Sequence, residues 1–149
     1  MLGKAQWAWL ESALQQPADL RLIVTSIQFL NPGNGWEAWS TMPLERDRLI
    51  ALIKKYQVQN VIFISGDRHY GEISKYEASG VPTFYDFTSS GLTHGKFYGM
   101  WEKNPYRMGK TSIKNNYGLI QVDWENKSVT LSLYDSKKGL VNTQEIELK

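Results

Sequence analysis

The chain has 149 residues, of which 42% are hydrophobic, and its 17 Lys and Arg against 15 Asp and Glu leave a net charge of +2. This length suits one domain with a sizeable core, and the composition excludes a disordered protein. The chain has no Cys, which excludes disulfides and thiolate metal sites within it, and no clustered basic face, so nucleic acid is not expected as a specific partner.

The first half predicts an α/β unit. Residues 6–16 have apolar side chains at helical spacing, and residues 20–27 form a continuous apolar strand. A second helix is predicted over 43–56, with Pro43 at its first position, and a second buried strand over 60–65. A helix between two such strands predicts a parallel pair with a right-handed crossover.

The second half is β-rich. Residues 125–127 and 136–139 have the composition of hairpin turns, and residues 91–116 form a long segment that we expect to be a functional loop. Five short strands are predicted, at 72–78, 83–90, 117–124, 128–135 and 142–148. The fold class is therefore α/β (α+β), with one parallel strand-helix-strand unit followed by mostly antiparallel strands in a single domain, 1–149.

Two compartment signals are missing from the sequence. No apolar run approaches the roughly 18 residues of a membrane span, so none is expected. Residues 1–16 are amphipathic and contain Glu11, which argues against a signal peptide there.

Four side chains that can bind a ligand or take part in catalysis lie close together in "VIFISGDRHYGEI", residues 61–73. They are Asp67, Arg68, His69 and Glu72, and they follow a buried strand. In open α/β sheets, ligands bind beyond the carboxyl ends of the parallel strands. Gln28 follows the other strand, so Gln28, Asp67 and His69 are expected to face the same crevice.

Asp67 and His69 suit two chemistries, metal ligation and general acid/base catalysis. The structural alternatives are a turn aspartate and a histidine bonded to the backbone. His94 is the only other histidine, and it is a candidate second ligand or substrate contact. Ser89 and Ser90 lack the G-x-S-x-G elbow of a serine nucleophile.

Several ordered segments resemble the carboxyl-terminal part of PhoD-like alkaline phosphatases, members of the calcineurin-like metallophosphoesterases. These segments are "LGKAQWAWLESALQQPADLRLIVTSIQF", "GWEAWSTMPLERDRLIALI", "NVIFISGDRHYGEI", "FYDFTSSGLTH" and "NNYGLIQVDWENKSVTLSLYDSKKGL". The resemblance implies a β-sandwich flanked by helices, and metal ions that activate water against a phosphate ester.

The resemblance also implies roles for individual residues. In the superfamily the last ligand motif is G-H-x-H, and here residues 66–69 read G-D-R-H. Asp67 and His69 are thus the expected metal ligands and catalytic residues. Gln28, Arg68 and His94 are the expected substrate contacts. The metal would be calcium, iron, manganese or zinc.

The superfamily's amino-terminal motifs D-x-H, G-D-x-x-D-R and G-N-H-[DE] do not occur ahead of "LGKAQWAWLE". We therefore expect this chain to be the carboxyl-terminal portion of a phosphatase domain, with little or no activity alone. We also expect its open half-sandwich to be covered by self-association or by the missing amino-terminal half.

Two alternatives stay open. One is a non-catalytic β-rich binding or assembly module that kept the fold and lost the site. The other is a metal-independent hydrolase that uses Asp67 and His69. PhoD-like enzymes are often exported, so the parent protein is a candidate for the periplasm or the extracellular space.

Overall fold

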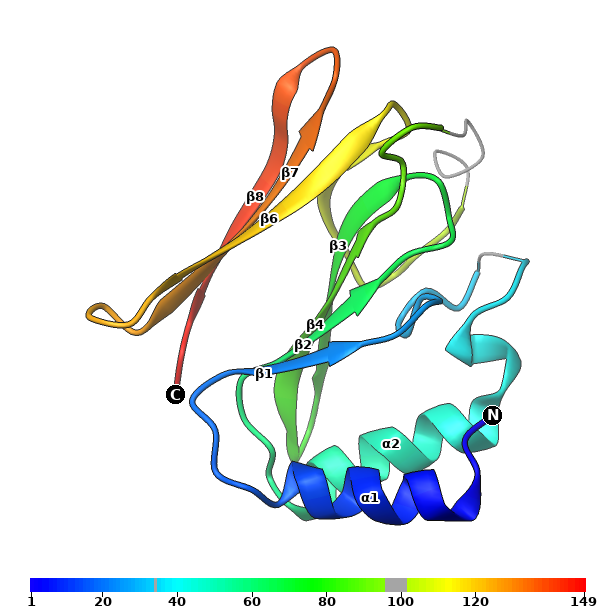
Figure 1. The fold of residues 1–149 in the computed structure, drawn as a ribbon, viewed down its shortest axis with the longest axis vertical. Coiled ribbons are helices and arrows are strands. Elements are labelled where there is room, and N and C mark those ends of the chain that lie inside the picture. Colours follow the sequence, from blue (N-terminus) through cyan, green and yellow to red (C-terminus); the bar gives the residue numbers. More distant parts are fainter. Residues whose placement is uncertain (34, 96–101) are drawn as a thin grey trace.

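The computed structural model describes residues 1–33, 35–95 and 102–149, and these residues form three layers (Figure 1). Two helices cover one face of a five-stranded sheet, and a three-stranded sheet packs on the other face. The predicted α/β class with a β-sandwich flanked by helices is therefore confirmed. No helix in the described part of the chain is long and apolar enough to cross a membrane.

The helical layer consists of α1 (Lys4–Leu14), the 3-10 turn η1 (Trp39–Thr41) and α2 (Pro43–Lys55). Pro43 begins α2 as predicted, because a proline at the first helical position has no amide hydrogen to leave unpaired. Lys54 and Lys55 lie in the last turn of α2, where positive charge interacts favourably with the helix dipole.

The larger sheet has the order β1-β2-β4-β3-β5. Its strands are β1 (Arg21–Val24), β2 (Val61–Ser65), β3 (Gly71–Ala78), β4 (Val81–Ser89) and β5 (Arg107–Ser112). β1 and β2 are parallel, as predicted, and β4 adds a third parallel strand that the sequence did not reveal. β4 reaches this position because β3 and β4 form an antiparallel hairpin and β4 enters between β2 and β3.

The smaller sheet is an antiparallel meander of β6 (Asn116–Asp123), β7 (Ser128–Asp135) and β8 (Gly139–Glu147). Both predicted hairpin turns are present. The expectation of a loop over 91–116 was wrong in part, because β5 lies within it. The segment "RMGKTS" is short and polar, and its pairing with β3 shifts register, so its alternation of side chains is weak.

The face of the larger sheet that meets the helices changes from apolar to polar along its strands. Side chains that pair across β2, β4 and β3 lie on the same face and form rows. Three such rows follow one another toward the carboxyl ends of β2 and β4: Val61–Phe84–Tyr76, Phe63–Asp86–Ser74 and Ser65–Thr88–Glu72.

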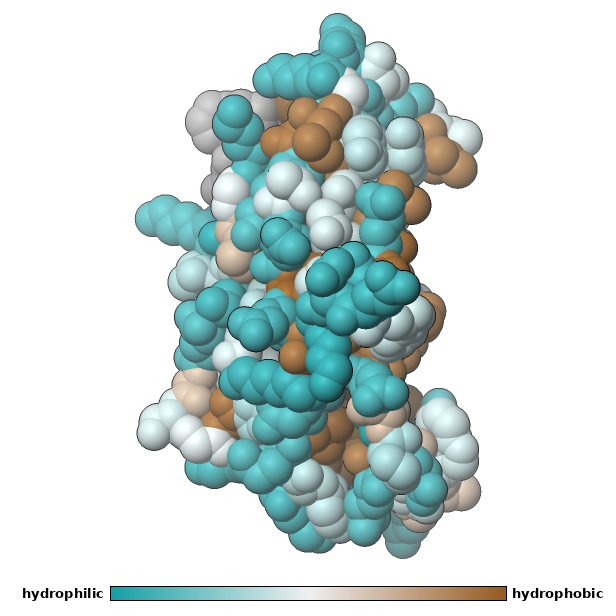
Figure 2. Space-filling view, turned by 90° about the vertical axis from the view of Figure 1, so that its left-hand side faces the viewer, coloured by the Kyte–Doolittle hydropathy of each residue, from teal (hydrophilic) through white to brown (hydrophobic). Residues whose placement is uncertain are grey.

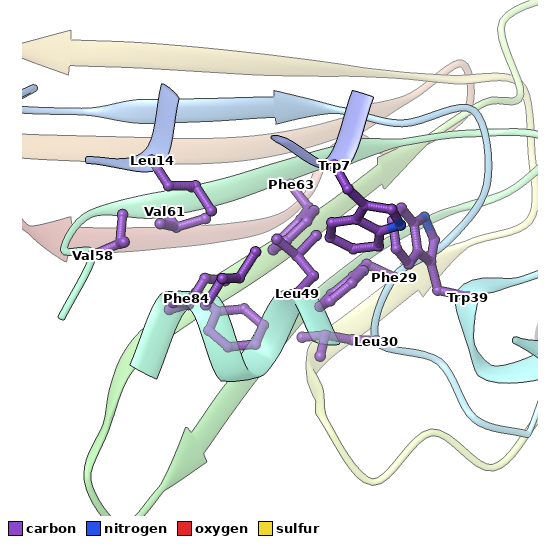
Figure 3. Packing of buried hydrophobic residues seen from close by; sticks show 12 residues of the cluster. Trp7, Leu14, Phe29, Leu30, Trp39, Leu49, Val58, Val61, Phe63 and Phe84 are labelled. Carbon is purple, nitrogen blue, oxygen red and sulfur yellow. The ribbon is translucent and has the colours of Figure 1, made fainter. Parts of the chain in front are cut away.

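An aromatic core fills the space between the helices and the apolar end of this face (Figure 3). The ring of Phe63 stacks on that of Phe29, with centroids 4.0 Å apart and planes at 4°. Trp39 meets Phe29 edge-on at 5.2 Å, and Leu49 of α2 is fully buried beside them. We name this cluster of Phe29, Trp39, Leu49, Phe63 and Phe84 the aromatic core.

The opposite face of the larger sheet packs against the smaller one. Ile62, Ile73 and Phe87 form a second cluster with the inward side chains of β7, among them Leu131 and Leu133.

Polar side chains dominate the molecular face in Figure 2, with hydrophobic atoms visible in small areas between them.

Each sheet has two edge strands, β1 and β5 in the larger sheet and β6 and β8 in the smaller one. Apolar side chains on β1 and β6 remain exposed. Leu22 and Val24 of β1 are 45% and 77% accessible, and Tyr117 of β6 is 51% accessible. Such edges are ready templates for pairing with a further strand.

Candidate functional site

The loops that follow β1, β2 and β4 meet at the carboxyl-terminal edge of the larger sheet. The His69 amide donates to the Ser90 hydroxyl at 2.9 Å, which joins the loop after β2 to the loop after β4. Ligands bind at this edge in open α/β sheets. The parallel strands thus bring these loops together at one end of the sheet, and β4 supplies a third loop. The prediction that Gln28, Asp67 and His69 face the same crevice does not hold for Gln28, whose side chain is buried.

His69 and His94, the two histidines of the chain, lie side by side in these loops. Their ring centroids are 5.3 Å apart and their planes are nearly perpendicular. Asp67 and His94 are exposed, and His69 is half-buried. The Nδ1 atom of His69 is buried and has no hydrogen-bond partner in the described part of the chain.

The backbone at Asp67 and His69 is left-handed, with φ values of 67° and 55°. Side chains other than glycine lose roughly 1 kcal/mol per residue in this region. Two such residues within three positions require support from the surrounding structure. Backbone strain of this kind is concentrated at functional sites, where side chains must be aimed against local preference.

Gln28 lies at the same end of the sheet, but its amide is buried and fully engaged. Its Nε2 donates to Glu72 at 2.7 Å and to Thr88 at 2.9 Å. Its Oε1 accepts from Asn31 and from Tyr70, both at 3.2 Å. Gln28 is thus a member of a polar network beneath the loops.

Arg68 points inward as well. Its guanidinium forms a buried ion pair with Glu102, and it lies 5.5 Å from the centre of the Tyr70 ring. The Nε atom of Arg68 has no partner among the described residues. Contact between Arg68 and a substrate would therefore use a side chain that Glu102 already holds.

Glu72 is the centre of this buried network. Its carboxylate is inaccessible to solvent and accepts from Arg107 Nε at 2.6 Å and from Asn104 at 3.1 Å. The Tyr70 hydroxyl has one hydrogen to donate, and Glu72, Glu102 and Gln28 are its alternative acceptors, at 3.2, 3.0 and 3.2 Å. A buried carboxylate is stable only with such partners. Burial and the nearby charges of Glu72 and Glu102 raise the pKa of Tyr70, so its hydroxyl stays protonated.

Asp86 anchors the loop after β1 from below. One of its oxygens accepts from the amides of Phe29 and Leu30 at 2.8 and 2.9 Å, and the other accepts from Ser65 at 2.6 Å. Complete burial raises the pKa of Asp86 to about 6, although these hydrogen bonds act in the opposite direction.

Sequence reasoning missed most of the network: Asn31, Tyr70, Asp86, Glu102, Asn104 and Arg107. One signal was available for Asp86. Phe84, Asp86 and Thr88 alternate along one predicted strand, which places a carboxyl in line with a core phenylalanine. A charged group at a buried strand position indicates a specific set of partners.

The side chains at this edge fit part of a metal site. An unpartnered imidazole nitrogen, a second imidazole and an exposed carboxylate are nitrogen and oxygen donors of the type that divalent ions take. Within residues 1–33, 35–95 and 102–149, no group of three or more His, Asp and Glu side chains is close enough together to hold an ion. The donors present among these residues are of a type that suits a divalent ion, but they are too few to hold one by themselves.

Comparisons with known proteins agree with this fold. The family model described as PhoD-like phosphatase matches residues 1–135. A structure titled "Structure of PhoD" superimposes with a TM-score of 0.73 at 18% identity, covering 99% of this chain and 35% of that one. Purple acid phosphatase PPD1 from yellow lupin (Lupinus luteus) seeds gives a TM-score of 0.57 at 15% identity, covering 97% and 28%. No curated protein matches the sequence.

Proposed function

Because this chain belongs to the family of PhoD-like phosphatases, we propose that it supplies one wall of a metal centre that hydrolyses phosphate mono- or diesters. The observation that carries the proposal is the unpartnered, buried Nδ1 of His69, with the ring of His94 5.3 Å away. A buried polar atom without a partner is costly, and a metal ion or a substrate group would satisfy it.

In this proposal Asp67 and His69 hold the ion, and His94 contacts the substrate or completes the ligand set. A bound divalent ion lowers the pKa of its water and polarises the phosphoryl oxygen. Calcium, iron, manganese and zinc are the candidate ions. Gln28 and Arg68 remain predicted substrate contacts, and each would exchange a present hydrogen bond for one to the ester.

The remaining ligands would come from segments outside this chain. The chain spans 35% of the length of the first phosphatase structure and 28% of the second. We propose that the open edges of β1 and β6 receive the amino-terminal portion of the domain or, when that portion is lacking, a second copy of the chain. Export of the parent protein remains part of the proposal.

Metal binding is testable because the chain has only two histidines. We would add Mn²⁺ to the isotope-labelled chain and follow the two imidazole signals by NMR. We expect both signals to broaden at low Mn²⁺, and His69→Ala to abolish the broadening of His94. Lys4→Ala, a surface change on α1, is the control. Equal broadening of His94 with and without His69 would contradict the proposal.

Catalysis is tested separately. We expect the chain alone to show little or no hydrolysis of an aryl phosphate when calcium, iron, manganese or zinc is added. Adding a polypeptide that carries the family's amino-terminal motifs should produce turnover that His69→Ala removes. Strong metal-dependent turnover by the chain alone would refute the proposal that the remaining metal ligands come from segments outside this chain. Turnover that persists after chelation would favour a metal-independent hydrolase. If neither metal binding nor turnover is detected, the result would favour a non-catalytic assembly module.

A further inference from the structure

A short segment ties the site loop to the buried network. We call residues 102–107 the strap, because three of its side chains reach into the sheet. Glu102 bonds to Arg68, to the Tyr70 hydroxyl at 3.0 Å and to Asn31 at 3.2 Å. Asn104 donates to Glu72 and to Ser74, and Arg107 donates to Glu72.

The strap holds the two residues that flank His69. Arg68 and Tyr70 are both buried, whereas Asp67 is exposed and His69 is half-buried. Arg68 and Tyr70 are the chain neighbours of Asp67 and His69. Holding their two side chains in the buried network therefore fixes the backbone from which the side chains of Asp67 and His69 project.

The strained backbone needs this anchoring. Asp67 and His69 are left-handed, and neither is a glycine. The side chain of Arg68, which lies between them, forms an ion pair with Glu102 and packs against the Tyr70 ring. On the far side of His69, the Tyr70 hydroxyl lies between Glu72 and Glu102, at 3.2 and 3.0 Å.

We infer that Glu102 is a positioning residue: through Arg68 and Tyr70 it holds Asp67 and His69 in the left-handed conformation that presents them to a metal ion. Glu72 supports the same hydroxyl from below. The metal-related part of this inference rests on the proposed function, whereas the conformational part does not.

The test uses NMR of the labelled 149-residue chain without metal. A residue with positive φ has its amide hydrogen close to its own Hα, which gives a strong intraresidue cross-peak. We expect strong cross-peaks at Asp67 and His69 and a cross-peak between the rings of His69 and His94. Glu102→Gln and Tyr70→Phe should weaken all three by several-fold while the remaining spectrum keeps its dispersion.

Glu77→Gln is the matched control, because Glu77 is an exposed partner of Lys75 at the other end of β3. It should leave the three cross-peaks at wild-type intensity. Wild-type intensities in both Glu102→Gln and Tyr70→Phe would overturn the inference. If one of the two variants does not fold, the other decides, since Glu102→Gln changes only the strap and Tyr70→Phe removes one oxygen.

Mn²⁺ then separates the two proposals. We expect both variants to need several-fold more Mn²⁺ than the wild type for the same broadening of the His69 signal. A wild-type chain that shows no broadening would overturn the proposed metal site, while the cross-peaks would still decide the positioning role. Equal broadening in wild type and variants would overturn the link between the strap and the metal.

Discussion

The aromatic core and the buried network around Glu72 occupy two ends of the same sheet face. At one end Phe63 and Phe84 pack against apolar rings. At the other end Ser65 and Thr88 share a hydrogen bond, and the Gln28 amide donates to both Thr88 and Glu72. The two regions meet in the middle row, where Phe63 of the aromatic core pairs with Asp86. The difference shows that a few residues along each strand separate the part that stabilises the fold from the part that arranges the site.

The strongest test of this division removes a ring from the apolar end. Phe63 is fully buried, so Phe63→Ala should lower the free energy of unfolding by about 4 kcal/mol. Urea unfolding measures the loss. Leu92→Ala, at a side chain that is 71% accessible, is the control and should change stability by less than about 0.5 kcal/mol. A loss below about 1 kcal/mol in Phe63→Ala would contradict a stabilising role for the ring.

Asp86 lies at the boundary between the two regions, and it should make stability depend on pH. Its pKa is about 6 in the folded chain, against an ordinary value of 3.8. Between these values the folded carboxyl holds a proton that the unfolded chain has released. The free energy of unfolding should therefore fall as pH rises from 4 to 6, by about 2 kcal/mol.

Asp86→Asn removes this titration. We expect the variant to lose the fall between pH 4 and 6 in urea unfolding, and to exceed the wild type in stability at pH 7. Asp19→Asn, at an exposed aspartate, should keep the wild-type pH dependence. An unchanged fall in Asp86→Asn would assign the titration to another group.

The polar end is tested by Glu72→Gln. The amide keeps the shape of the side chain but weakens the charge-assisted bond to Arg107, so we expect a loss of about 2 kcal/mol in urea unfolding. Glu77→Gln removes an exposed ion pair and should cost less than about 0.5 kcal/mol. Equal effects of the two variants would mean that the network does not depend on its buried charge.

The smallest effect on stability is expected outside both regions. Val24→Lys changes a side chain that is 77% accessible on the edge strand β1, so stability should stay within about 0.5 kcal/mol. Light scattering at micromolar concentration should show association of the wild type and its loss in this variant, because an edge lysine opposes strand pairing. A wild-type monomer would contradict the proposed self-association.

The apolar region could be predicted from the sequence more fully than the polar one. Continuous apolar runs at 20–27 and 60–65 and the helical spacing near Pro43 identified β1, β2 and α2, with errors of a few residues at the ends. These patterns are local, because burial imposes a period on each element by itself. The parallel pairing of β4 with β2 is not local, and it emerged only from the structure.

The site divides in the same way. The position of Asp67 and His69 at the end of the sheet could be predicted, because they follow a buried strand directly. Glu102 and Arg107 could not, since their partners lie 34 and 35 residues away in sequence and β5 lacks a clear strand pattern. The inward direction of Gln28 likewise depends on Glu72 and Thr88, which belong to other strands.

The left-handed backbone at Asp67 and His69 has a consequence for protein engineering. Glycine is the residue that this conformation favours, so a library selected only for heat resistance should enrich glycine at both positions. Such a selection would raise the thermal midpoint and at the same time remove the Asp67 carboxylate and the His69 imidazole, the proposed metal ligands. Aspartate and histidine that persist at these positions under combined selection for heat resistance and phosphate release would be kept for their chemistry.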